Sequence, residues 1–251
     1  MGALADRLLW WRRHRPRPSI AGRSLRWLGL AVFAAVALTA LSTLSLRWID
    51  PPTSAFMLQS RHAARSQGRD DFRIQHYWVD WRHIAPAAKV AVVAAEDQRF
   101  LDHDGFDVDS IADAVYERVK RGRQRGASTV SQQVAKNLYL WPGKSFLRKG
   151  LEAYFTLLIE LFWPKQRVLE VYLNLAQFGD GVFGIEAASV AYFRKSAEEL
   201  TAREAATLAA VLPNPVRYRA ERPSAYVRSR SQWILAQMRM LGGPDYLDEL
   251  R

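Results

Sequence analysis

The sequence contains no cysteine among its 251 residues. It therefore cannot form a disulfide scaffold or a cysteine-ligated zinc site, and a packed core must supply its stability. The sequence also lacks a pair of histidines at metal-ligand spacing, a glycine-rich phosphate loop and a Gly-x-Ser-x-Gly nucleophile motif. The chemistry of the chain therefore has to be sought in other residue patterns.

Acidic residues are scarce at the N-terminus. Residues 1–27 contain seven arginines and one acidic residue, Asp6, and so carry +6 of the net charge of +11. A basic chain suggests nucleic acid, anionic lipid or a phosphate-bearing substrate as a partner. Hydrophobic residues make up 49% of the chain and charged residues 24%, a composition typical of a packed domain and not of a disordered chain.

A long apolar run follows the arginines. Residues 28–46 contain no charge and no proline, and as a helix they would span about 28 Å, close to the thickness of a bilayer core. This run disfavours nucleic acid as the partner. The arginines before it place the N-terminus in the cytoplasm and the rest of the chain outside. A cleaved signal peptide is the alternative, but the run is longer than the apolar segment of a typical signal peptide.

The chain therefore divides into four parts. They are a cytoplasmic basic tail (1–27), a transmembrane signal anchor (28–46), a linker (47–80) and an extracytoplasmic domain (81–251). Asp50-Pro51-Pro52 ends the membrane helix. The pattern predicts a loosely structured stretch over 53–80 with a short strand near 73–79, and a mainly α domain after it. The expected helices are 86–95, 108–121, 129–140, 145–163, 165–175, 185–193, 201–212 and 224–241. A basic loop is expected at 122–126.

The first candidate site is the stretch Glu96 to Gly105, which follows the apolar run 90–95. A carboxylate that leaves an apolar helix at the edge of a cleft is a candidate acid or base, because partial burial raises its pKa. The alternative is a helix end followed by a solvated charged loop.

Two further clusters are candidate anion sites. Residues 126–137 combine a helix start with Ser128, Thr129, Gln132, Gln133, Lys136 and Asn137, and free N–H groups at a helix start favour anions. The second cluster is Lys144, Arg148, Lys149 and Glu152, which fits either a phosphate clamp or an ordinary ladder of surface ion pairs. In a third segment Glu170, Tyr172 and Asn174 lie among Leu and Val, where polar groups need partners and most are structural.

Together these segments resemble the peptidoglycan glycosyltransferases, the glycan-polymerising family found alone or fused to a penicillin-binding transpeptidase. Five motifs carry the resemblance in the family's order: EDQRFLDHDG (96–105), GASTVSQQVAKN (126–137), RKGLE (148–152), KQRVLEVYLN (165–174) and AATLAAVLPNP (205–215). The sequence has no Ser-x-x-Lys motif of a transpeptidase. It therefore resembles the monofunctional form, with residues 81–251 as the glycosyltransferase domain.

The resemblance implies a lysozyme-like α fold and polymerisation of lipid II, with β-1,4 bond formation, inversion and release of undecaprenyl pyrophosphate. Glu96 matches the family's general base, and Glu152 matches a second carboxylate near the leaving pyrophosphate. Substrate-binding roles fall on Ser128, Thr129, Gln132, Gln133, Lys136, Asn137, Lys144, Arg148 and Lys149. Lys144 stands where the family often has Arg, so it lacks the bidentate fork. Architectural roles fall on Asp97, Phe100, His103, Gly105, Glu170, Asn174 and Asn214.

The resemblance also implies the surroundings of the enzyme. It requires no organic cofactor, and it allows a divalent metal, Mg²⁺ or Mn²⁺, at Glu152. The expected partners are lipid II, the growing glycan strand, the membrane and other proteins of cell-wall synthesis, and not nucleic acid. The expected location is the bacterial inner membrane, crossed once, with the N-terminus in the cytoplasm and the catalytic domain outside.

Two other functions fit parts of the sequence. A glycan-cleaving enzyme of the same fold would use one or two carboxylates but would have no need of a cationic clamp for pyrophosphate. A non-catalytic membrane-anchored scaffold would tolerate any residue at position 96. The apolar segments 138–141 and 155–163 are expected either to contact the outer leaflet or to belong to the core.

Overall fold

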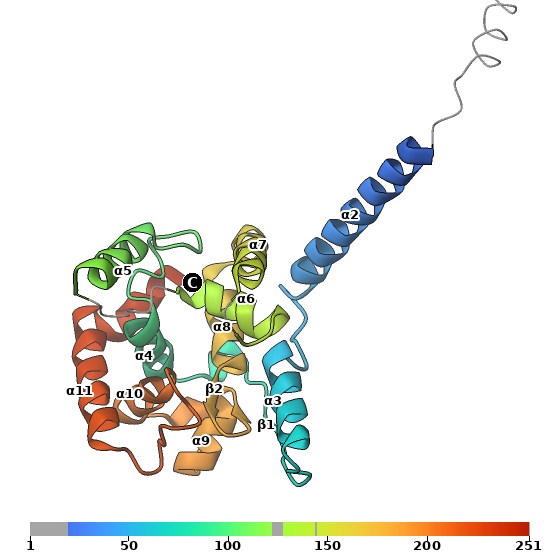
Figure 1. Cartoon of the computed structure of the whole chain (residues 1–251). Coiled ribbons are helices and arrows are strands. Elements are labelled where there is room, and N and C mark those ends of the chain that lie inside the picture. The colour runs from blue at the N-terminus through green and yellow to red at the C-terminus, as the bar shows by residue number, and fades with distance from the viewer. Residues whose placement is uncertain (1–19, 122–127, 144, 251) are drawn as a thin grey trace, which may run out of the picture. The chain divides into compact units, whose positions relative to one another are not determined.

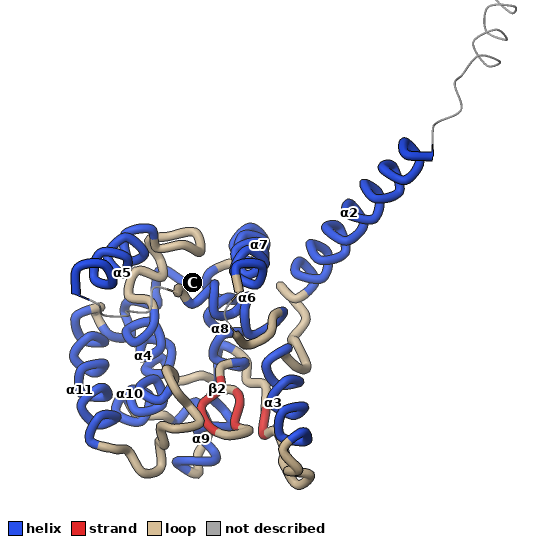
Figure 2. The backbone as a smooth tube through the Cα atoms, viewed as in Figure 1, coloured by secondary structure: helices blue, strands red, loops and turns tan. Residues whose placement is uncertain are grey.

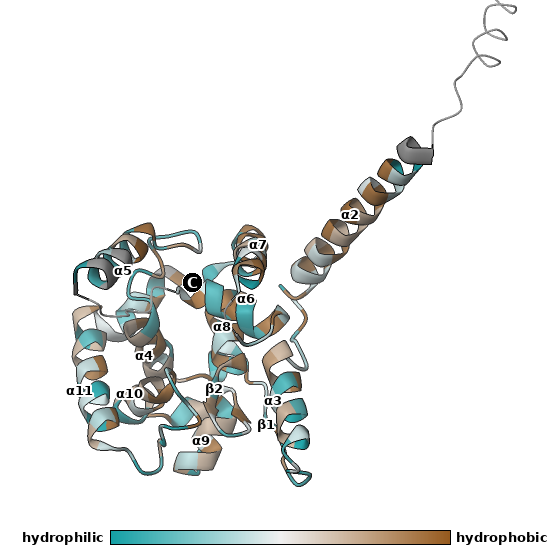
Figure 3. Cartoon of the chain, viewed as in Figure 1, coloured by the Kyte–Doolittle hydropathy of each residue, from teal (hydrophilic) through white to brown (hydrophobic). Residues whose placement is uncertain are grey.

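The structure is a computed structural model that describes residues 20–121, 128–143 and 145–250. The chain divides between Ser42 and Thr43 into two units, each described here by itself. The first unit holds most of α2 (Ile20–Ser45). Within α2, Arg23–Ser45 is long and apolar enough to cross a membrane, and only 6% of its most apolar window is buried. Hydrophobic colours run along this helix in Figure 3. The helix begins eight residues before the predicted start at Leu28.

The second unit is built from helices and one small sheet (Figures 1 and 2). Its α-helices are α3 (Ala55–Ser66), α4 (Pro86–Glu96), α5 (Val108–Arg121), α6 (Val130–Tyr139), α7 (Phe146–Phe162), α8 (Lys165–Leu175), α9 (Ile185–Phe193), α10 (Ala202–Val211) and α11 (Ala225–Met240). Short 3-10 helices are η1 (Trp81–His83), η2 (Ala197–Glu199) and η3 (Gly243–Leu250). The strands are β1 (Gln75–His76), β2 (Gln177–Gly179) and β3 (Val182–Phe183), in the order β1-β3-β2. In this sheet β1 is parallel to β3 and β2 is antiparallel to it.

Local sequence signals account for most helix ends. Thr129 and Gln132 form a capping box at the start of α6, and Thr201 and Glu204 form one at the start of α10, each through reciprocal side-chain and backbone hydrogen bonds. Ser145 caps α7 as predicted. The short strand predicted within 73–79 is β1. The basic loop predicted at 122–126 lies outside the described residues.

The prediction of a loosely structured stretch over 53–80 was wrong, because α3 lies within it. Ser54 caps α3 by accepting a hydrogen bond from the Met57 N–H, and the helix buries Met57 and Ala64 against the domain. Its other face is basic and exposed, so the apolar stripe that would have revealed the helix is narrow. The prediction also missed η3, which follows the end of α11.

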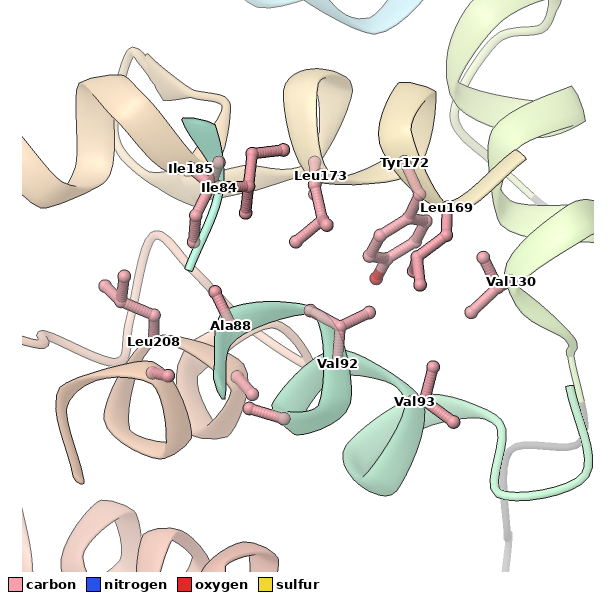
Figure 4. Packing of buried hydrophobic residues seen from close by; sticks show 14 of the residues in the cluster. Ile84, Ala88, Val92, Val93, Val130, Leu169, Tyr172, Leu173, Ile185 and Leu208 are labelled. Carbon is pink, nitrogen blue, oxygen red and sulfur yellow. The ribbon is translucent and has the colours of Figure 1, made fainter. Parts of the chain in front are cut away.

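The core joins two groups of helices (Figure 1). One group is α4, α10 and α11, which pack on one another, and the other is α6, α7 and α8. Helix α4 lies at the join, because it also contacts α8. Every residue from Ala88 to Ala94 is buried, and Figure 4 shows Val92 of α4 facing Leu169 and Leu173 of α8. Burial of each such side chain contributes roughly 1.5–3 kcal/mol, so α4 holds its last residue, Glu96, on a rigid support.

Candidate active site

Glu96 is the last residue of α4, and its side chain is partly buried. Burial raises the pKa of the Glu96 carboxyl, and the nearby charge of Asp97 adds to the rise. A hydrogen bond from Gln133 and the positive charges of Arg230 and Lys136 oppose that rise in pKa. The bond from Gln133 Nε2 to Glu96 Oε2 is 2.8 Å long. A carboxylate in such a setting is suited to accept a proton near neutral pH.

A pocket of about 650 Å³ opens beside Glu96. Its wall combines the end of α4, the start of α6 and residues from α5 and α11. The lining residues include Asp97, Arg99, Asp107, Ser110, Ser128, Thr129, Gln133, Arg230 and Trp233. A smaller pocket of about 230 Å³ is lined by Phe56, Lys136, Asn137, Tyr172, Gln177 and their neighbours. Gln133 and Pro213 line both pockets, so the two spaces adjoin at these residues.

Helix α6 contributes polar residues to both pockets. Gln133 faces Glu96, while Lys136 and Asn137 line the smaller pocket. Gln132, predicted to bind substrate, lines neither of these pockets, because it is 4% exposed and its side chain accepts a hydrogen bond from the Thr129 N–H. The capping box therefore engages the amide that the sequence analysis assigned to a ligand.

A buried carboxylate holds the cations of α7. Glu152 is 2% exposed, and its Oε2 accepts a hydrogen bond of 2.6 Å from Arg148 Nη1, while its Oε1 pairs with Lys149. Lys136 lies within the electrostatic field of Glu152, Arg148 and Lys149 as well as that of Glu96. The structure thus brings the predicted second carboxylate and three of the predicted cations together. Lys144 lies outside the described residues.

The stretch after Glu96 ties α4 to α6. His103 Nδ1 accepts a hydrogen bond from the Gly105 N–H, so Nε2 carries the proton and donates to Asp97 at 3.0 Å. Asp97 also accepts from the Val130 N–H at the start of α6, and Thr129 donates to the carbonyl of Gly105. These contacts hold the loop in one shape.

Two residues of this loop fill tight spaces. Gly105 has φ +87°, and a Cβ there would lie 2.8 Å from side-chain atoms of Thr156 and Glu160, so only glycine fits without rearrangement. Phe100 is fully buried, and Lys165 Nζ lies 4.8 Å from the centre of its ring. In the structure these residues shape the loop beside Glu96.

Three predicted residues make hydrogen bonds with the backbone instead of lining either pocket. Asn174 exchanges hydrogen bonds with the backbone N–H and C=O of Val79. Glu170 accepts from the Trp81 N–H at 2.7 Å and pairs with Arg167. Asn214 forms a turn by accepting from the N–H groups of Arg217 and Tyr218. All three make the contacts of structural residues.

The sequence analysis missed Arg230, Trp233 and Tyr172. Arg230 and Trp233 belong to α11 and line the larger pocket, and Arg230 Nη2 donates to the carbonyl of Ala95 at 3.3 Å. Tyr172 donates a hydrogen bond of 3.2 Å to Gln133 Oε1. Tyr172 had a local signal, since a polar residue among Leu and Val needs a buried partner. Arg230 and Trp233 had none, because only the packing of α11 against α4 brings them to the pocket beside Glu96.

The site defines a class of enzyme. It combines a partly buried carboxylate of raised pKa with nearby cations, and the same chain contains an apolar helix long enough to cross a membrane. Such a site suits a membrane-associated transferase whose leaving group is an anion.

Comparison with known proteins identifies the family. The sequence profile described as Transglycosylase matches residues 64–239. The biosynthetic peptidoglycan transglycosylase of Xanthomonas campestris pv. campestris (strain B100) is 53% identical over 230 residues, which cover 92% of this chain and 94% of the relative. Proteins of the same name from Xanthomonas axonopodis pv. citri (strain 306) and Pseudomonas entomophila (strain L48) are 50% and 49% identical, over 95% and 91% of this chain and 97% and 93% of theirs.

The chain therefore belongs to the transglycosylase family of peptidoglycan biosynthesis. It is a glycosyltransferase with the mainly α, lysozyme-like fold predicted from the sequence. The alternative of a glycan-cleaving enzyme finds no support among these relatives.

Proposed function

We propose that this chain polymerises glycan strands from lipid II, with Glu96 as the general base. The observation that carries the proposal is the position of Glu96, which is held on a buried helix beside a 650 Å³ pocket and within reach of cations on α6 and α11. The 4-hydroxyl of the acceptor loses its proton to Glu96 as its oxygen attacks C1 of the donor sugar. The bond from C1 to the pyrophosphate oxygen breaks, and that oxygen keeps the electron pair. Attack from the opposite face inverts the anomeric centre.

The cations of α6 and α7 are suited to the leaving group. Negative charge grows on the pyrophosphate as the bond breaks, and fixed positive groups stabilise it most strongly where water is excluded. Arg148 keeps a donor for this purpose, because its buried Nε has no hydrogen-bond partner among the described residues. Lys149 is half exposed despite its bond to Glu152, so it can also reach a ligand. Glu152 then serves to hold these cations in place.

The described residues do not fit a metal site at Glu152. Both of its carboxylate oxygens are engaged by Arg148 and Lys149, and the described parts of the chain contain no group of three or more His, Asp or Glu side chains arranged to hold a metal ion. The charge on the leaving group is therefore compensated by the cations of α6 and α7.

Incubation of the full chain with labelled lipid II tests the proposed function and the role of metals together. We expect glycan polymer and free undecaprenyl pyrophosphate, with a rate that a chelator leaves largely unchanged. Loss of polymer on chelation, with recovery on adding Mg²⁺ or Mn²⁺, would show that the reaction needs a divalent metal. Absence of polymer under every condition, or cleavage of preformed glycan, would refute the polymerase.

The location that we propose is the inner membrane, with the N-terminus in the cytoplasm and the catalytic unit outside. The arginine-rich residues before α2 support this orientation by the positive-inside rule. It would bring the catalytic unit to the same face as exported lipid II and as other proteins of cell-wall synthesis, which we propose as partners.

An exposed apolar face of α7 is suited to contact the same membrane. Phe146, Leu147, Leu157 and Leu161 are 58–101% exposed, and at 100° per residue they fall within about 100° of the helix circumference. The apolar segments 138–141 and 155–163, expected from the sequence either to contact the outer leaflet or to belong to the core, are only partly exposed. Leu138, Leu140, Ile159 and Trp163 belong to the core, whereas Trp141, Leu157 and Leu161 are exposed. Isolated apolar residues are common on surfaces, but four exposed apolar side chains on one side of a helix indicate a contact surface.

Vesicle co-sedimentation of residues 43–251 tests this surface. We expect binding that falls about tenfold in Leu157→Gln/Leu161→Gln, because moving two leucine side chains out of lipid loses more than ~1.4 kcal/mol. The matched control is Val190→Gln/Val216→Gln, which changes two exposed valines elsewhere and is expected to bind like the parent. Equal binding of the α7 variant and the control would refute the proposal.

A further inference from the structure

A chain of two hydrogen bonds leads from the core to the base. Tyr172 of α8 donates to Gln133 Oε1 of α6 at 3.2 Å, and Gln133 Nε2 donates to Glu96 Oε2 of α4 at 2.8 Å. Tyr172 is 2% exposed. Figure 4 shows it projecting from α8 towards α4, between Val92 and Val130. Three helices that are far apart in the sequence therefore meet in this one contact.

The amide of Gln133 has two ends with opposite properties. With its NH₂ group towards Glu96, it donates to the carboxylate and stabilises the ionised form. Turned over, it would present its carbonyl oxygen, which repels a carboxylate and accepts a hydrogen bond from a protonated carboxyl group. The protonation state of Glu96 is thus coupled to the orientation of the amide.

Tyr172 breaks the symmetry between the two orientations. A buried hydroxyl group needs an acceptor for its proton, and among the described residues the only acceptor recorded for Tyr172 is Gln133 Oε1. If the amide turned over, its NH₂ group would face the tyrosine oxygen, and the buried O–H would have no acceptor. The cost of that unmade bond favours the orientation that donates to Glu96.

We propose that Tyr172 is a positioning residue that fixes the Gln133 amide and so keeps Glu96 in the ionised form needed to accept a proton. The inference rests on the proposed function of Glu96 as base. The other groups that face Glu96 act by charge. Lys136 of α6 and Arg230 of α11 favour its ionised form, and Asp97 opposes it. None of these charges changes when the hydroxyl group of Tyr172 is removed.

The test is Tyr172→Phe in the full chain, with kcat/KM for lipid II measured as a function of pH. We expect the acidic limb of the profile to move to higher pH by about one unit. Without the Tyr172 hydroxyl group, the Gln133 amide no longer favours the ionised form of Glu96. Above that limb the rate should approach that of the parent. A rate lowered equally at every pH, with an unmoved limb, would make Tyr172 a structural residue only.

Two controls separate this role from a general loss of packing. Tyr192→Phe also deletes a partly buried tyrosine hydroxyl. Tyr192 lies on α9 and donates to the carbonyl of Phe178 on β2 at 3.3 Å, and its variant is expected to leave the acidic limb in place. In a Gln133→Met background, Tyr172→Phe should cause no further shift. A full shift in that background would refute the route through Gln133.

A titration without substrate keeps this inference distinct from the proposed function. Infrared difference spectra between each chain and its Glu96→Gln derivative isolate the carboxylate band of Glu96. We expect its midpoint to lie higher in Tyr172→Phe than in the parent. If the parent formed no polymer, the proposed function would fail while this titration still reported on Tyr172. An unchanged midpoint in a chain that does polymerise would overturn the role of Tyr172 alone.

Discussion

Glu96→Gln is expected to abolish glycan polymerisation and leave the fold intact. Glutamine retains the shape of the side chain and can still bond to Gln133, but it cannot take a proton from the acceptor hydroxyl. Loss of a general base lowers rates by roughly 10²–10⁴-fold. The measurement is the turnover of labelled lipid II across a range of pH. Polymer formation within tenfold of the parent rate would show that Glu96 is not the base. A non-catalytic scaffold would tolerate the substitution.

The same variant is expected to be at least as stable as the parent at neutral pH. Burial raises the pKa of the Glu96 carboxyl, so the folded chain binds this proton more tightly than the unfolded chain does. The stabilisation from this group is therefore complete below its unfolded pKa and is lost as the pH rises through the raised folded pKa. Above the raised pKa the ionised, desolvated carboxylate lowers stability, and glutamine removes that cost.

Thermal unfolding at several pH values checks this sign. The melting temperature of Glu96→Gln should equal or exceed that of the parent at pH 7, and the difference should shrink towards acidic pH. Glu198→Gln is the matched control, because it removes the same charge from an exposed position on η2. A marked loss of stability in Glu96→Gln alone would show that the carboxylate holds the fold together.

Elements with local signals could be predicted from the sequence. The capping boxes of α6 and α10 and the Ser145 cap of α7 place three helix starts from a few neighbouring residues. The pairing of Glu152 with Arg148 and Lys149 also follows from spacings of four and three along one helix. The burial of Glu152 could not be predicted from the sequence, because it depends on how α7 packs against α6.

Contacts between distant segments could not be predicted from the sequence. Tyr172, Gln133 and Glu96 come from three helices, and Arg230 lies 135 residues from the carbonyl of Ala95 that it contacts. Gln132 shows the opposite error. Its residue type and position suit a ligand contact, yet the capping box already engages its side chain. For the missed residues and for Gln132 alike, contacts formed only in the folded chain decide which polar side chains reach the site.

Lys136→Met is expected to lower the polymerisation rate at saturating lipid II by about 10²–10³-fold, the range for removing one group that stabilises transition-state charge. Lys136 lines the smaller pocket and interacts electrostatically with both Glu96 and Glu152. It therefore lies between the proposed base and the cations that face the leaving group. The loss should fall on kcat more than on KM, because charge on the pyrophosphate develops as the bond breaks. Lys195→Met, which removes a cation paired with Glu204 outside both pockets, should retain the parent rate.

The pH profile gives Lys136 a second signature. Burial lowers the pKa of Lys136 below that of an ordinary lysine, Glu152 and Glu96 partly restore that pKa, and Arg148 and Lys149 lower it further. Lys136 should therefore lose its charge on the alkaline side, and the parent rate should fall there. In Lys136→Met that alkaline limb should vanish from the residual activity. The acidic limb should move upward, because the charge of Lys136 lowers the pKa of Glu96. A parent-like profile at a parent-like rate would exclude Lys136 from the reaction.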